Sequence, residues 1–179
     1  GMAAEVQDFI HFAQVVARQV SDDIVNRAKR IIDQLQKQTR IDPLLKIPNR
    51  RAFDESLSDA FHRFNRHETP FCLLVFDIDD FGAFNKEFDV TVGDQALRTM
   101  ARILAAEIRE VDFLARYGGE ELGVILHESD RESALLVAER LRKAVAAHGF
   151  NGKTVTVSGG ISQIRHGDTP NILIERASM

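Results

Sequence analysis

The chain has 179 residues, of which 44% are hydrophobic and 28% charged, a mix typical of a soluble globular protein rather than a disordered or membrane-embedded one. The formal net charge of −4 gives no broad basic face, so general nucleic-acid binding is disfavoured. An acidic chain can still bind a nucleotide if a divalent cation neutralises the phosphates, so local carboxylates are the feature to look for. The single Cys72 cannot form an intrachain disulfide, which favours a cytoplasmic domain.

Residues 4–39 predict one long helix, because they contain no Pro or Gly and apolar side chains recur every three or four positions. The steps form a heptad pattern with one extra four-residue step, a stutter, which favours a parallel coiled-coil stalk. Packing of this helix on its own domain is the alternative. Pro43 and Pro48 end the helix. We therefore expect a signalling helix in residues 1–40 and a globular domain in residues 41–179, whose last helix is cut short.

The globular part alternates helical and strand-like patterns, with one hairpin. This order predicts an α/β (α+β) fold, with a mixed or antiparallel central sheet flanked by helices. In chain order we first expect a helix over 51–67 capped by Asn49, a strand over 70–78, a loop from 81 leading into a helix over 91–108, and a hairpin in "DFLARYG" and "ELGVILH". We then expect a helix over 129–148 capped by Asp130 or Ser129, a strand in "KTVTVSGGIS" and a helix from about Pro170.

Carboxylates stand at the borders of two apolar strands. In "FDIDDF" (76–81), strand alternation predicts Asp77 and Asp79 on the same face. In "RYGGEEL" (116–122), two glycines allow a tight reversal that would bring Glu120 or Glu121 near Asp77. Carboxylates from two neighbouring strands form a hard oxygen site that suits Mg²⁺. The alternative is a solvated strand end and a charged hairpin tip.

The segment between these motifs carries side chains suited to a nucleotide. Gly82 allows the backbone to approach phosphate oxygens closely. Asn85 and Asp94 can read a guanine edge, because an amide donates and accepts while a carboxylate accepts from N1–H and N2–H₂. The alternatives are that Asp94 caps a helix after Gly93 and that Asn85 belongs to an ordinary turn.

The motifs "DPLLKIPNRRAF", "FDIDDF", "N…GDQAL", "RYGGEEL" and "TVSGGIS" resemble, in order and spacing, the GGDEF family of diguanylate cyclases. The resemblance covers about residues 41–179. It implies a palm-like fold similar to that of adenylyl cyclase catalytic domains. It further implies that two such domains form a homodimer, each holding one GTP, and join the two nucleotides into cyclic di-GMP with release of pyrophosphate.

The resemblance also implies roles for the acidic residues. Asp77 and Glu120, helped by the Ile78 carbonyl, would hold Mg²⁺ or Mn²⁺. Glu121 would help to activate the attacking 3′-hydroxyl, so that it and Asp77 form the catalytic pair. These roles agree with phosphoryl-transfer chemistry, which depends mainly on alignment and charge neutralisation.

The binding residues follow from the same resemblance. Asn85 and Asp94 match the positions that read guanine, and the amides of Asp80 and Phe81 match those that meet the phosphates.

A further match, "REVD", places Arg109 and Asp112 at the RxxD position that binds cyclic di-GMP as a product inhibitor in many members. The alternative is a solvated salt bridge at a helix end.

The chain departs from the family pattern in ways that bear on activity. A lysine associated with the triphosphate is Gly82 here, and the signature ends in Leu122 rather than Phe. The 179 residues stop inside the last helix, where members normally carry a Lys and an Arg that reach the triphosphate, and the absence of these two residues implies weak GTP binding. Two other functions therefore stay open: a non-catalytic regulatory module that binds cyclic di-GMP through Arg109 and Asp112, and a dimerisation module that only binds GTP. A sensory or membrane domain upstream is also expected in the parent protein.

Overall fold

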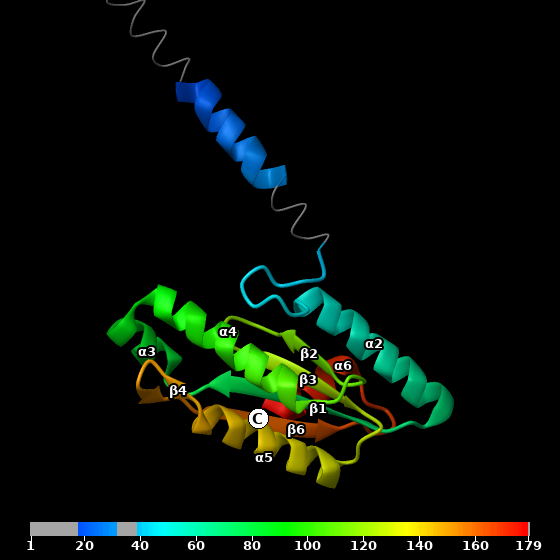
Figure 1. The fold of residues 1–179 in the computed structure, drawn as a ribbon. Coiled ribbons are helices and arrows are strands. Elements are labelled where there is room, and N and C mark those ends of the chain that lie inside the picture. Colours follow the sequence, from blue (N-terminus) through cyan, green and yellow to red (C-terminus); the bar gives the residue numbers. More distant parts are fainter. Residues whose placement is uncertain (1–17, 32–38, 179) are drawn as a thin grey trace, which may run out of the picture. The chain divides into compact units, whose positions relative to one another are not determined.

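The computed structural model describes residues 18–31 and 39–178. The chain divides into two units, residues 1–39 and 40–179. In the first, residues 18–31 are helical, as the sequence predicts (Figure 1). Residues 4–17 and 32–38 of the helix expected over 4–39 lie outside the described residues, and residue 39 is not helical. Within the described ranges, no helix combines the length and apolar character needed to cross a bilayer.

The second unit is built on a four-stranded antiparallel sheet with the order β2-β3-β1-β6. β1 (Phe71–Ile78) is central and pairs with both β3 and β6, as its unbroken apolar run predicts. The other elements are α2 (Arg50–His67), α3 (Phe81–Phe88), α4 (Val90–Glu107), β2 (Phe113–Arg116), β3 (Leu122–His127), α5 (Arg131–Ala147), β4 (Gly149–Phe150), β5 (Lys153–Thr154), β6 (Val157–Gln163) and α6 (Pro170–Ser178). This arrangement confirms the expected fold class.

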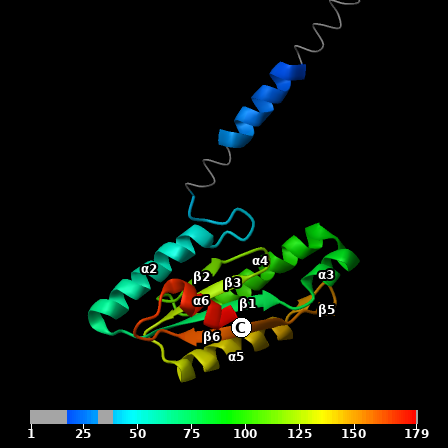
Figure 2. The ribbon, with the colours of Figure 1, turned by 180° about the vertical axis from the view of Figure 1, so that it is seen from behind.

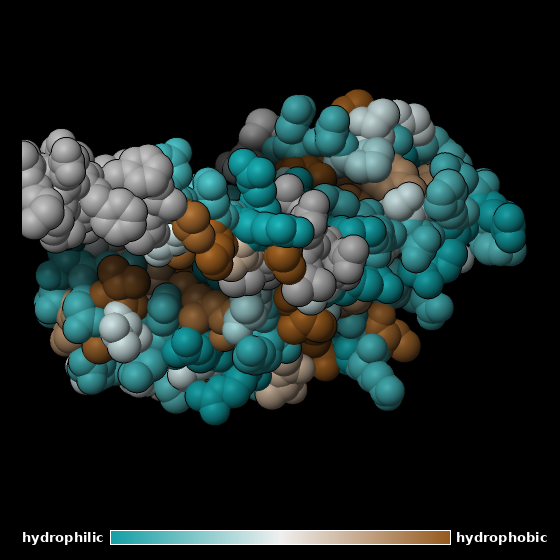
Figure 3. All heavy atoms as spheres, turned by 90° about the horizontal axis from the view of Figure 1, so that it is seen from above, coloured by the Kyte–Doolittle hydropathy of each residue, from teal (hydrophilic) through white to brown (hydrophobic). Residues whose placement is uncertain are grey.

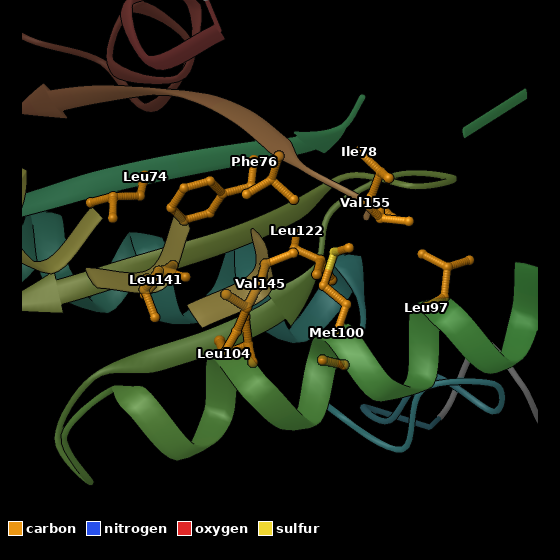
Figure 4. Close-up of a cluster of buried hydrophobic side chains, with 14 of the residues drawn as sticks. Leu74, Phe76, Ile78, Leu97, Met100, Leu104, Leu122, Leu141, Val145 and Val155 are labelled. Carbon is orange, nitrogen blue, oxygen red and sulfur yellow. The ribbon is translucent and has the colours of Figure 1, made fainter. Parts of the chain in front are cut away.

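Helices cover both faces of the sheet, so alternate residues of β1 enter two separate cores. Leu74, Phe76 and Ile78 pack against α3, α4 and α5 (Figures 1 and 4). Phe71, Leu73 and Val75 pack on the other face against α2 and α6, which lie on the near side in Figure 2. Asp77 lies on the same face of the sheet as the buried Val75, two residues further along β1, but it is exposed. The strand thus carries a carboxylate to the edge of the core covered by α2 and α6.

The helix caps agree with the sequence. The side chain of Asn49 accepts a hydrogen bond from the Ala52 amide at 3.1 Å and caps α2. The side chain of Asp130 accepts one from the Ser133 amide at 2.8 Å and caps α5. Such caps satisfy amides that have no partner within the helix.

The prediction of a loop over residues 81–88 is wrong, because this segment forms the short helix α3. Its aromatic side chains, Phe81, Phe84 and Phe88, stand on one face, and Phe81 and Phe84 are buried. Burial of that face stabilises the helix despite Gly82, which has low helix propensity. The two-stranded ribbon of β4 and β5 also differs from the single strand expected in "KTVTVSGGIS".

Exposed apolar side chains are scattered over the globular unit. The face in Figure 3 is mostly hydrophilic, with hydrophobic residues in small separate groups. The more exposed ones of this unit include Val90, Val111 and Leu136. Single exposed apolar residues of this kind are normal on soluble proteins.

Candidate active site

The register of the sheet brings Asp77 and Glu121 together. β1 and β3 pair Phe76 with Leu122, so Asp77 and Glu121 are the next residues outward on the two strands. Both line one surface cavity of about 270 Å³. Its other lining residues are Val75, Ser158, Gly159, Gly160, Ala177 and Ser178. Among the described residues, neither carboxylate receives a hydrogen bond or forms an ion pair, so both are available to a cation.

Glu120 does not line this cavity, although the family resemblance assigns it to the metal. It lies on the turn between β2 and β3, one residue before Glu121. The carboxylate of Glu121 folds back over Gly118, where a Cβ atom would overlap its Oε2. Neither Gly118 nor Gly119 has a positive φ, so the first glycine is needed for space rather than for a left-handed turn.

Arg116 holds the turn from inside the hairpin. Its guanidinium donates to the Gly119 carbonyl at 2.7 Å from Nη2 and to the Gly118 carbonyl at 3.2 Å from Nε. Its Nη1 also pairs with the Asp42 carboxylate at 3.1 Å, and both side chains are largely buried. The Glu121 carbonyl accepts from the Tyr117 amide at 2.9 Å. These bonds fix the backbone that carries Glu121. Sequence reasoning missed Arg116; an Arg two residues before the Gly-Gly pair was the available signal.

Asp79 does not share the cavity with Asp77, because β1 ends at Ile78 and the alternation stops there. The Asp79 carboxylate instead accepts a hydrogen bond from the Thr156 hydroxyl at 2.6 Å. Its amide donates to the Thr156 carbonyl at 3.0 Å. The expectation that Asp77 and Asp79 act as a pair on one face is therefore wrong.

The start of α3, which follows the end of β1 in the chain, presents free backbone amides. Asp80 precedes the helix in a left-handed conformation, with φ of 55° and no side-chain cap. The first helical bond runs from the Phe84 amide to the Asp80 carbonyl at 3.0 Å, so the amides from Phe81 to Ala83 have no helical partner. Such amides, at the positive end of the helix dipole, suit phosphate oxygens. Nothing lies within 4 Å of where a Gly82 side chain would begin.

Asn85 and Asp94 lie near each other at the junction of α3 and α4. The Asn85 side chain occupies the space that Gly93 leaves, where a Cβ would overlap its Oδ1. This Oδ1 is buried and, among the described residues, has no hydrogen-bond partner. The cap of α4 is Asp89, which accepts from the Thr91 amide at 2.7 Å. Asp94 is therefore not the helix cap, and that alternative is removed.

The site is thus divided into two parts. Asp77 and Glu121 lie on the face covered by α2 and α6, whereas Asn85 and Asp94 come from the helices on the other face. The β1–α3 turn, residues 78–81, joins the two parts. A ligand that contacts both parts of the site has to extend along this turn, as a nucleoside triphosphate can.

Arg109 and Asp112 form a separate cluster at the other end of β3. Arg109 donates from Nη2 and Nε to the two Asp112 oxygens at 3.0 and 3.1 Å. The His127 amide also donates to Asp112, whose side chain is only 1% exposed, while that of Arg109 is 52% exposed. The hydrogen bond with Asp112 raises the pKa of Arg109. The predicted pair exists, but it is not the fully solvated salt bridge of the alternative interpretation.

His127 is a second residue that sequence reasoning missed, and nothing in the pattern singles it out. Its imidazole lies 3.2 Å from the Arg63 guanidinium, measured from Nδ1 to Nη2. Burial, followed by repulsion from Arg63, lowers its pKa below the ordinary value of 6.5. At neutral pH the ring is therefore uncharged.

The donor set at the strand ends fits a hard divalent cation. Within the described part of the chain, no three His, Cys, Asp or Glu side chains gather closely enough to form a metal cage. Two carboxylates and a nearby backbone carbonyl nevertheless suit Mg²⁺, which commonly takes one or two carboxylates and completes its shell with waters and substrate phosphates.

The chain is similar to proteins of one known family. The family model described as "Diguanylate cyclase, GGDEF domain" matches residues 39–179. Diguanylate cyclase DgcP of Pseudomonas aeruginosa is 38% identical over 149 residues, 81% of this chain and 22% of that protein. The chain thus spans about a fifth of the length of that curated relative.

Two solved structures are similar as well. The GGDEF domain of DgcB from Caulobacter crescentus, in complex with c-di-GMP, matches with a TM-score of 0.74 and 30% identity over 78% of this chain and 86% of that one. An active GGEEF domain of a diguanylate cyclase from Vibrio cholerae matches with a TM-score of 0.65 and 32% identity over 68% of this chain and 79% of that one. Sequence, fold and site agree that the chain belongs to the GGDEF family of diguanylate cyclase domains.

Proposed function

We propose that this domain is a diguanylate cyclase that condenses two GTP into cyclic di-GMP and two pyrophosphates, and that it works in the cytoplasm. The observation that carries the proposal is the meeting of Asp77 and Glu121, two carboxylates that receive no hydrogen bond from the described residues, at the end of the strand that leads into the amides at the start of α3. The solved Vibrio cholerae GGEEF domain is described as active, so Glu in place of the Asp of the signature is compatible with catalysis.

The two ends of the nucleotide would be held by different elements. The amides of Asp80 and Phe81 would donate to phosphate oxygens, while Asn85 and Asp94 would bind the guanine edge. The Oδ1 of Asn85, which has no hydrogen-bond partner among the described residues, supports this, because a buried acceptor without a donor is costly unless a ligand supplies one. A guanine amino group would supply that donor.

Asp77 and the Ile78 carbonyl would hold Mg²⁺ or Mn²⁺ together with one of the two glutamates. When bound, the cation would neutralise phosphate charge and favour loss of pyrophosphate. The resemblance gives this place to Glu120 and the activation of the 3′-hydroxyl to Glu121. The shared cavity supports the opposite division, with Glu121 beside the cation and Glu120 facing the hydroxyl.

The reaction itself would run between two copies. The 3′-oxygen of one GTP attacks the α-phosphorus of the other, a new P–O bond forms, and the bond to the bridging oxygen of pyrophosphate breaks. The hydroxyl proton leaves towards a glutamate. The same transfer in the reverse sense closes the ring. Each domain supplies half of the reacting groups, so a homodimer is required.

The helix over residues 18–31 supports a coiled-coil contact as the source of that dimer. Val20, Ile24 and Ile31 are about half exposed on this helix, at spacings that put them on one face. We expect Ile24→Asp to shift the protein towards monomer in analytical ultracentrifugation and to lower turnover at limiting protein concentration. Dimerisation unaffected by Ile24→Asp would remove the stalk from the proposal.

The central test follows pyrophosphate and cyclic di-GMP when the protein is incubated with GTP and Mg²⁺ at dimer-forming concentrations. Turnover is expected in the native protein and not in Asp77→Asn. A titration with Mn²⁺ then separates the glutamates: the variant of the metal-binding one, Glu120→Gln or Glu121→Gln, should need more Mn²⁺ for half-maximal rate. No product under any activating condition would overturn the proposal.

A second function rests on a different observation. Gly82 leaves the start of α3 without a basic side chain, and Arg109 exposes half of its side chain at a distant cluster. A regulatory module that binds cyclic di-GMP there without making it is the alternative. Calorimetry with cyclic di-GMP tests this site, and equal affinity for the native protein and Arg109→Ala would exclude it.

A further inference from the structure

The β1–α3 turn, which joins the two parts of the site, makes two hydrogen bonds to Thr156, the residue before β6. The Asp79 carboxylate accepts from the Thr156 hydroxyl at 2.6 Å, and the Asp79 amide donates to the Thr156 carbonyl at 3.0 Å. Both residues are half-buried. Side-chain and backbone bonds between the same two residues fix the distance and the orientation of the turn, which a single bond could not do.

This turn includes a backbone conformation that needs external support. Asp80 adopts φ of 55°, in the left-handed region that residues other than Gly enter rarely. Its own side chain makes no capping bond to α3. Strained residues persist only where their surroundings determine them. The Thr156 contacts on one side and the buried ring of Phe81 on the other provide those surroundings.

The groups on either side of Asp79 are those that the proposed function assigns to the cation and the phosphates. The Ile78 carbonyl precedes it, and the amides of Asp80 and Phe81 follow it. Asp79 itself does not line the cavity that holds Asp77 and Glu121. Its oxygen is committed to Thr156, so it acts on the site through the backbone.

We propose that Asp79 and Thr156 form a positioning pair that holds the β1–α3 turn in the shape that binds the triphosphate of GTP. The inference rests on the proposed function and assigns it a residue, Thr156, that lies outside the metal and guanine groups. Loss of the Asp79–Thr156 hydrogen bond would let the amides at the start of α3 shift, while Asp77 and Ile78 stay on β1, where they pair with β6. Nucleotide affinity would then fall, whereas cation binding would remain.

The test compares Thr156→Val, which keeps the branched shape and removes the hydroxyl, with Thr156→Ser, which keeps the hydroxyl. The probe is 3′-deoxy-GTP, which carries the triphosphate and guanine but lacks the attacking hydroxyl. With Mg²⁺ present, calorimetry should give a Kd about tenfold weaker for Thr156→Val, since small displacements of binding groups have large effects. Thr156→Ser should bind within about twofold of the native protein, because the charge-assisted hydrogen bond is restored.

Two further measurements separate positioning from general damage. Mn²⁺ binding, followed by electron paramagnetic resonance, should be the same in Thr156→Val and the native protein but lost in Asp77→Asn. In turnover, Thr156→Val should raise KM for GTP more than it lowers kcat. Equal Kd values for Thr156→Val and the native protein would overturn the inference, as would equal losses in the Val and Ser variants. Undiminished 3′-deoxy-GTP and Mn²⁺ binding in Asp77→Asn would instead count against the proposed function.

Discussion

The two ends of β3 carry polar clusters of opposite character. At its start, Asp77 and Glu121 face a cavity and receive no hydrogen bond from the described residues. At its end, the buried Asp112 accepts from Arg109 and from the His127 amide, so its oxygens are satisfied within the protein. A buried polar group with all its partners stabilises the fold, whereas carboxylates without partners are positioned for a ligand. The contrast separates groups kept for binding from groups that also build the structure.

The largest expected effect removes a charge at the open end. Asp77→Asn should lower turnover at least about a hundredfold, because the cation site loses a ligand. In buffer without divalent cations, the free energy of unfolding should stay equal or rise slightly, since two neighbouring like charges become one. Product assays and urea titrations measure the two quantities. The exposed Asp59→Asn on α2 is the matched control, with both quantities unchanged. A large loss of stability in Asp77→Asn would mean that Asp77 also stabilises the fold, contrary to the comparison with Asp112.

At the satisfied end the expected result is the reverse. Asp112→Ala should lower the free energy of unfolding by about 2–3 kcal/mol, because the His127 amide and one edge of Arg109 lose their acceptor. Urea denaturation measures it. Glu139 and Arg142 form a pair with the same three-residue spacing and fork geometry on an exposed surface, so Glu139→Ala should change stability little. Equal effects in the two variants would mean that burial of Asp112 contributes nothing.

The two glycines of the hairpin turn provide a sharper comparison within the open end. Gly118→Ala should lower turnover about tenfold, because its methyl group would displace the Glu121 carboxylate. Gly119→Ala should be close to native, since nothing lies within 4 Å of the added Cβ and its φ is not positive. Parallel rate measurements on both variants decide, and similar rates would show that Glu121 moves aside without cost.

Gly82 tests the phosphate end of the site. Gly82→Ala should stabilise the protein by about 0.5–1 kcal/mol, because the position is open and helical. Gly82→Lys should in addition lower KM for GTP severalfold by placing a cation near the start of α3. Thermal unfolding and initial rates measure these changes. If Ala and Lys give the same KM, the charge at this position is irrelevant.

The smallest expected effect is a pH dependence at the satisfied end. Burial lowers the pKa of His127 below 6.5, so the unfolded chain binds more protons in the window just below that pH. Stability should therefore fall as pH drops below about 6.5 and should be regained as pH rises. Replacing the ring in His127→Gln should flatten this part of the stability curve, whereas His62→Gln, at an exposed site on α2, should leave it unchanged. Identical pH profiles for native and His127→Gln proteins would exclude this source.

Periodic apolar patterns allowed most of the fold to be predicted. The caps Asn49 and Asp130, the buried run of β1 and the hairpin around the Gly-Gly pair all follow from local rules, and the structure confirms them. The helix α3 was missed because Gly82 and Asn85 suggest a loop. Its signal was the spacing of Phe81, Phe84 and Phe88, and the burial that decides the outcome comes from the rest of the domain.

The sequence predicted which residues form the site better than it predicted how they are arranged. Sequence alone placed Asp77 beside one of two adjacent glutamates, and the register is what brings Glu121 to the cavity. It also placed Asp79 with Asp77, because alternation could not show that the strand ends at Ile78. Partners such as Thr156 and Asp42 come from distant parts of the chain, and no local pattern reveals them.

Asp77 and Glu121, which receive no hydrogen bond from the described residues, are available to a cation at the end of β1. A cation that binds only the folded state adds to stability by mass action, about 2.7 kcal/mol at a hundred times its Kd. The melting temperature of the native protein, but not of Asp77→Asn, should therefore climb by several degrees as Mn²⁺ is added. The melting temperature, measured against Mn²⁺ concentration, therefore reports how far the cation site is filled, and it needs no nucleotide, product or dimer.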